Sequence, residues 1–130
     1  MNKYSQLSHT HFQYRIWRNE LEMMQKETDF FLSVIEEITA GEEPAPQSEP
    51  GWFINQFHHF QRLIKQLQGE LLGIEKALAE GALQDKSLDK EQKLDHQYFK
   101  EEIDYFEQDY RSVKGKFRAF IAQSEPEKAD

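Results

Sequence analysis

The chain has 130 residues, a formal net charge of −8 and no cysteine. This length fits one domain, and the lack of cysteine excludes disulfides, Cys-ligated zinc and thiol catalysis. An acidic surface repels phosphate backbones and anionic lipid headgroups, so we expect no binding to nucleic acid or to membranes. No apolar run is long enough to predict a signal peptide or a membrane span. We therefore expect a cytoplasmic protein.

Glycine and proline divide the chain at two places. The first break is the segment 41–51, GEEPAPQSEPG, because no helix crosses its three prolines. Gly41 can supply the left-handed residue that ends a helix, and Gly81 is expected to end the next one at the second break, 81–87. We predict helices over about 5–40, 51–80 and 87–123, which form a single domain of residues 1–123. A disordered tail is expected at 124–130.

All three predicted helices carry apolar residues at alternating steps of three and four positions. This spacing is the a/d heptad pattern of helices that pack side by side, and in 51–80 it is unbroken over nearly four heptads. The short second connection makes the second and third helices antiparallel neighbours. We predict an all-α, up-down-up antiparallel three-helix bundle with coiled-coil-like packing. The heptad residues are Leu7, Tyr14, Trp17, Leu21, Met24, Phe31, Ile35 and Ile38; Phe53, Phe57, Phe60, Ile64, Leu67, Leu71, Ile74 and Leu78; and Phe99, Ile103, Phe106, Tyr110, Val113, Phe117 and Phe120.

This heptad layout resembles the spectrin-type three-helix coiled coil, and Trp17 in the first helix adds to the likeness. The segment 53–64, FINQFHHFQRLI, is similar to small uncharacterised helical-bundle proteins of Bacteroidetes-type bacteria. The first resemblance implies the bundle layout alone. The second implies no known activity.

Matching the turns of the helices predicts which residues share a layer of the core. Rings concentrate at the end nearest the first break, where edge-to-face packing stabilises a core. A pocket for a flat or acyl ligand is the alternative interpretation of these rings. The expected layers are Ile35 with Phe57 and Val113, Phe31 with Phe60 and Tyr110, and Leu21 with Leu71 and Phe99.

The opposite end of the predicted core is polar. We expect a layer of His11, Arg18, Asp95 and His96 there, with Arg18 and Asp95 forming an interhelical ion pair. Such contacts can simply set the register of the helices. The alternative is a binding site for a small ligand or a metal ion. The Glu-x-x-His pairs of di-iron bundles do not occur in this sequence, and we expect no cofactor.

The first helix carries a second apolar stripe, roughly 100° around the helix from its heptad residues. Two interpretations stay open: the stripe is buried inside the monomer, or it forms a homodimer or binds a partner helix. Exposed apolar stripes of this length mark interfaces, and two-fold dimers are the commonest oligomers. We therefore expect the bundle to dimerise through its first helix. The stripe consists of Phe12, Ile16, Met23, Phe30 and Val34.

The sequence offers no motif for catalysis. No glycine elbow or oxyanion-hole turn accompanies its serines, and neighbouring acids such as Glu101 and Glu102 point about 100° apart on a helix. We expect no enzyme activity and see no sign of a small-molecule substrate. The expected function is a non-enzymatic protein-interaction module, an adaptor or chaperone-like helical bundle. A ligand- or metal-binding bundle that uses the polar end is the alternative.

Overall fold

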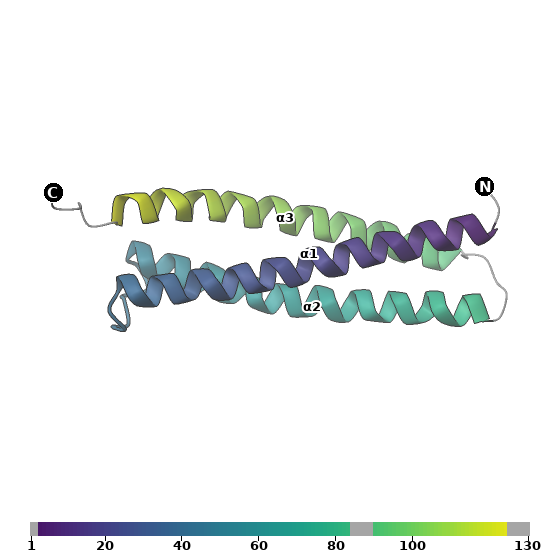
Figure 1. The fold of residues 1–130 in the computed structure, drawn as a ribbon, viewed down its shortest axis with the longest axis horizontal. Helices are drawn as coiled ribbons and strands as arrows, with labels where there is room; N and C mark the ends of the chain where they lie inside the picture. Colours follow the sequence, from purple (N-terminus) through teal and green to yellow (C-terminus); the bar gives the residue numbers. More distant parts are fainter. Residues whose placement is uncertain (1–2, 84–89, 125–130) are drawn as a thin grey trace.

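The fold is an antiparallel bundle of three long helices. The computed structural model describes residues 3–83 and 90–124, which form α1 (Lys3–Ile38), α2 (Glu49–Leu83) and α3 (Lys90–Ser124). The helices run up, down and up along one long axis (Figure 1). The predicted all-α three-helix architecture is confirmed. In the described part of the chain, no helix has an apolar stretch that could cross a lipid bilayer.

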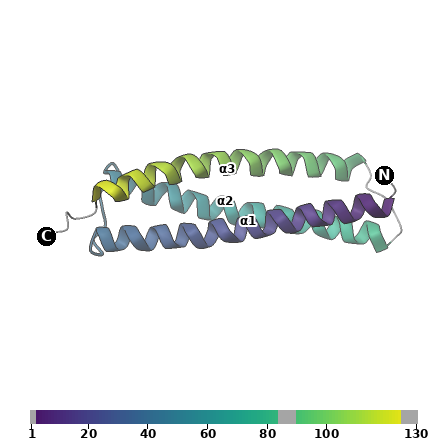
Figure 2. The same cartoon turned by 45° about the horizontal axis from the view of Figure 1, so that its top comes forward.

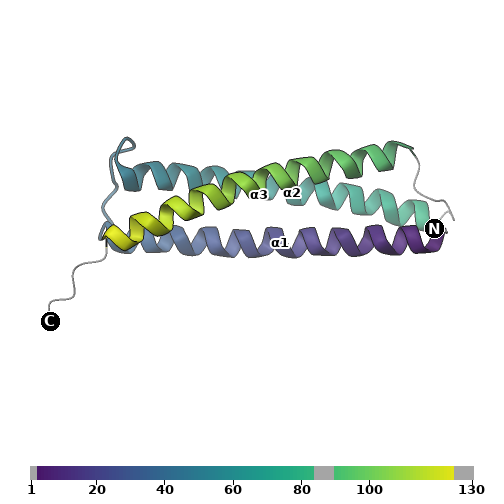
Figure 3. The same cartoon turned by 90° about the horizontal axis from the view of Figure 1, so that it is seen from above.

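The packing between helices is unequal. α2 packs closely against both of its neighbours along the chain, whereas α1 and α3, which run parallel, approach each other less closely. The axes cross at shallow angles, so that α3 passes over α2 when the bundle is seen from above (Figures 2 and 3). α1 and α3 therefore meet mainly through long side chains.

The second and third helices differ from the predicted bounds. α2 runs through Gly81 to Leu83, so the expectation that Gly81 ends this helix is wrong. α3 packs beside this turn, where the Gln92 side chain donates a hydrogen bond to the carbonyl of Ala77 at 3.1 Å and supports the continued helix. α3 ends at Ser124. The predicted start of this helix at 87 and the predicted tail from 125 onward lie outside the described residues.

α1 ends in a hydrogen-bonded left-handed turn. The N–H of Gly41 donates to the carbonyl of Glu36 at 2.9 Å, and the N–H of Ala40 donates to that of Glu37 at 3.2 Å. This pair of bonds satisfies two carbonyls that the helix end would leave free. Gly41 has the expected positive φ, +77°, and Ala40 shares the left-handed conformation with φ +55°.

α2 begins at Glu49, two residues before the predicted start at 51, and Ser48 caps its N-terminus. The Ser48 hydroxyl accepts a hydrogen bond from the N–H of Gly51 at 3.2 Å, and Pro50 is tolerated in the first turn because that turn needs no N–H from it. The preceding loop folds tightly over this turn. A Cβ atom at Gly51 would lie 2.0 Å from the carbonyl oxygen of Ala45.

The close approach of this loop makes Gly51 necessary. We expect Gly51→Ala to lower the free energy of unfolding by about 1–3 kcal/mol, since the loop must shift to admit one methyl group. Gly69→Ala is the matched control, because a Cβ there meets nothing within 4 Å. That substitution should stabilise the protein by about 0.5–1 kcal/mol. Urea denaturation measures both changes, and equal effects of the two substitutions would contradict the steric argument.

The core follows the predicted heptads. Every heptad residue of α3 is buried, and so are all but Ile74 in α2. In α1, six of the eight heptad residues are buried, whereas Leu7 is half-buried and Ile38 is exposed. The buried set also includes Thr10 and Thr28, which fill the gaps in the predicted repeat. The Thr28 hydroxyl donates to the carbonyl of Met24 at 2.7 Å, so this buried polar group is satisfied inside its own helix. Both threonines are absent from the predicted core because the heptad pattern was defined by apolar residues alone.

The predicted layer of Phe31 with Phe60 and Tyr110 is wrong, and the ring of α3 beside Phe31 lies about two helical turns further along the chain. Phe31 packs against Phe57 and Phe117, with ring centroids 5.4 and 5.0 Å apart, and Trp17 lies beside the ring of Phe99 at 5.1 Å. The reason is chemical as well as steric. A buried tyrosine hydroxyl needs a partner, and Tyr110 lies where it can donate to a carboxylate of α1.

Candidate functional site

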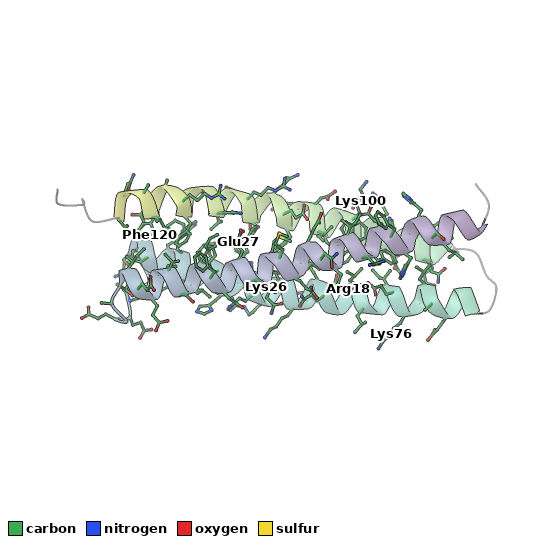
Figure 4. The ribbon with its side chains drawn as sticks, viewed as in Figure 1. Arg18, Lys26, Glu27, Lys76, Lys100 and Phe120 are labelled. Atoms are coloured by element: carbon green, nitrogen blue, oxygen red, sulfur yellow. The ribbon has the colours of Figure 1, made fainter. Side chains whose placement is uncertain are left out.

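The predicted polar end layer does not form a single cluster. Arg18 pairs with Glu75 of α2 and not with Asp95, so the predicted ion pair is wrong. This hydrogen bond to Glu75 is the main reason that the pKa of Arg18 rises above its usual value. Arg18 lies on the side of α1 that faces α2 (Figure 4). His11 and Asp95 are exposed.

His96 is half-buried and packs against aromatic residues of the core. Its ring lies 5.4 Å from that of Tyr14 and 5.2 Å from that of Trp17, and its Nδ1 is 3.2 Å from the Tyr14 hydroxyl. Burial, with Lys100 and His9 nearby, lowers the pKa of His96, which favours the neutral ring. Burial and the charges of Asp95 and Glu75 raise the pKa of Tyr14 to about 12. The arrangement is a packed aromatic contact between α1 and α3.

The histidines and acids do not assemble into a metal centre in the described part of the chain. Over residues 3–83 and 90–124, no three His, Asp or Glu side chains come close enough together to hold an ion. The geometry therefore lends no support to the metal-binding alternative at the polar end.

A half-buried carboxylate joins α1 to α3 near the middle of the bundle. Glu27 accepts hydrogen bonds from the Tyr110 hydroxyl and from the Lys114 ammonium, the latter at 2.8 Å. Burial alone would raise the pKa of Glu27, but these two partners outweigh it and lower the pKa. Glu27 lies on the side of α1 that faces α3 (Figure 4). The signal in the sequence was a tyrosine at a heptad position, whose hydroxyl required a partner.

A second carboxyl pair spans α1 and α3. Glu107 is hydrogen-bonded to Glu20, and burial followed by this neighbour raises the pKa of Glu107 to about 7. Arg111 lies 3.8 Å from the Glu107 carboxylate and opposes the shift only in part. The pair borders a cavity of about 200 Å³ between the two helices, which is also lined by Met23. This pair could not be predicted from the spacing of residues along the chain, because the two acids lie on different helices.

The second apolar stripe of α1 remains at the surface. Phe12, Met23 and Phe30 are 61%, 70% and 63% exposed. Ile16 is half-buried, and Val34 is half-buried against the core. The interpretation in which the monomer buries the whole stripe is therefore wrong. The stripe borders the flank of α1 that faces α3, since Met23 lines the cavity between these helices.

A groove follows the outer junction of α2 and α3. Two adjoining cavities of about 610 and 310 Å³ share Glu102 and extend from His59 to Ala77 along α2. Leucine, isoleucine and phenylalanine side chains form its floor, and Tyr98 and Tyr105 stand at its edge. Its acidic residues are Glu70, Asp95, Glu101, Glu102 and Asp109.

Comparison with known proteins adds no relative. No protein-family model, curated protein or solved structure matches this chain.

The Glu20–Glu107 pair predicts a pH-dependent stability. The folded chain holds the Glu107 proton up to about pH 7, whereas an unfolded glutamate releases it near 4.5. The contribution of Glu107 to the free energy of unfolding of the wild type therefore falls as the pH rises between these two values. Compared with wild type, Glu107→Gln should gain about 1–2 kcal/mol in the free energy of unfolding from pH 5 to pH 8.

Urea denaturation of both proteins at a series of pH values measures this difference. Taking the difference cancels the contribution of His96, whose lowered pKa acts in the opposite direction. Glu22→Gln, at an exposed position of α1, is the matched control. A difference between Glu107→Gln and wild type that stays constant with pH would refute a shared proton.

Proposed function

We propose that this protein is a non-enzymatic interaction module of the cytoplasm, a helical bundle that self-associates through α1. The observation that carries the proposal is the exposed apolar stripe of α1. An adaptor or chaperone-like role agrees with this surface, because helix faces and grooves bind partner helices. Burying three large exposed side chains against a second copy removes apolar area from water, which favours association.

The spacing of the stripe supports a second copy as the occupant. The stripe residues stand 11 and 7 positions before Met23 and 7 and 11 positions after it. At 100° per residue, all five fall within about 40° of the helix surface. In an antiparallel two-fold pair centred on Met23, Ile16 faces Phe30 of the second copy, and Phe12 faces Val34. Every apolar residue of the stripe then meets an apolar one.

The mass of the particle in solution tests the self-association. We expect light scattering to give the wild-type protein twice the mass of a single chain at micromolar concentration. The double variant Phe12→Ser, Phe30→Ser should associate at least 10-fold more weakly. The reason is the loss of apolar area at both ends of the stripe. Tyr98→Ser with Tyr105→Ser is the matched control, because these two exposed rings lie on α3 at the groove with α2, away from the stripe. A wild-type monomer at high micromolar concentration would refute the proposal.

The lack of cysteine makes the pairing register directly testable. Met23→Cys should form a disulfide-linked dimer under mild oxidation, because the two-fold axis places this position against itself. A mixture of Ile16→Cys and Phe30→Cys chains should cross-link to each other more than either does to itself. Preferential self-linkage of the Ile16→Cys chain would contradict the antiparallel pairing.

A further inference from the structure

The groove between α2 and α3 is long enough for a helix. Its lining extends from His59 to Ala77, a distance of about 27 Å at 1.5 Å per residue. That length corresponds to five helical turns. Near one end it has small residues, Gly73 and Ala77, and a Cβ atom at Gly73 would meet nothing within 4 Å. A Cβ atom at Gly69 would also meet nothing within 4 Å, so neither glycine lies at a close helix crossing inside the described chain.

The groove combines an apolar floor with exposed aromatic walls. Leu63, Leu67 and Phe106 line its larger part, and Ile74 and Phe99 line the smaller one. Tyr98 and Tyr105 stand at its edge with 63% and 77% of their surfaces exposed. Such walls suit the apolar face of an amphipathic helix, with ring faces available to cationic side chains.

The charges of the groove have one sign. Five of its lining residues are aspartate or glutamate, and no lysine or arginine lines either cavity. The α1–α3 cavity differs, since Arg111 and Lys114 offset its acids. Across the groove, Glu70 stands close to Glu102, and burial together with this neighbour raises the pKa of Glu102. A cation from outside the chain would relieve this repulsion.

The length, apolar floor and negative charge of the groove indicate which class of partner it binds. Phosphate backbones and anionic lipids are repelled by the acids. A second copy of this chain is also acidic, with a net charge of −8. We propose that the α2–α3 groove binds an amphipathic helix of another protein, whose apolar face is flanked by lysine and arginine. This surface is separate from the α1 stripe, so the proposal holds whether or not the protein dimerises.

Two synthetic 18-residue helical peptides test the proposal with the full chain. Both carry the same leucine stripe, flanked by lysine and arginine in one and by glutamate in the other. Fluorescence anisotropy should show saturable binding of the basic peptide at least 10-fold tighter than that of the acidic peptide. A basic peptide of the same composition with its leucines scrambled should also bind at least 10-fold more weakly, since charge alone does not fill the floor. Equal binding by either control peptide would overturn the proposal.

Matched variants locate the site. Gly73→Leu should fill the groove and weaken binding of the basic peptide at least 10-fold, whereas Gly69→Leu, also on α2 but outside the groove lining, should change it less than two-fold. Glu102→Gln with Asp109→Asn should weaken binding several-fold. Glu22→Gln with Glu36→Gln removes the same charge from α1 and should leave binding unchanged. Circular dichroism confirms that the variants fold.

The remaining outcomes are equally decisive. Equal losses for groove and control variants would refute the site. A change of oligomeric mass in Gly73→Leu, without a change in peptide binding, would assign the groove to a second copy and overturn the proposal. Phe12→Ser with Phe30→Ser should leave peptide binding intact, which separates a failure of this inference from a failure of self-association.

Discussion

The bundle depends on one buried column of side chains, contributed by all three helices at alternating steps of three and four residues. This column leaves each helix with only a narrow buried face. Helices of about 35 residues therefore keep most of their circumference at the surface. The apolar stripe on α1 and the acidic groove between α2 and α3 are exposed because each helix buries only this narrow face.

The heptad pattern predicted the fold because it is a local property. Phe53 to Leu78 and Phe99 to Phe120 could be assigned to the core from spacing alone, and each of those assignments to α3 is confirmed. The level of α3 against α1 could not be predicted in the same way. These helices are not consecutive, and sliding one by a turn keeps apolar residues opposite apolar residues. The Glu27–Tyr110 hydrogen bond distinguishes the two registers, and the heptad count ignored it.

The candidate sites were predicted less completely for a related reason. The stripe on α1 is a property of one helix, so its exposed residues could be found from the sequence. The pairs Arg18–Glu75 and Glu20–Glu107 join different helices, and their partners depend on the register. The acidic groove likewise needs two helices side by side. From the sequence alone, neighbouring acids of α3 were expected only to point in different directions around their helix.

The distribution of rings along the bundle makes its two ends mechanically different. Near the loop between α1 and α2, Phe31, Phe53, Phe57, Phe117 and Phe120 interlock with centroid separations of 5.0–6.1 Å. Toward the opposite end, the described ring contacts join Tyr14, Trp17, His96 and Phe99, and His96 Nδ1 lies 3.2 Å from the Tyr14 hydroxyl. The five-phenylalanine cluster therefore holds the helices together at the end near this loop. A force that pulls the helices apart would separate them first at the opposite end, and the phenylalanine cluster would act as the hinge.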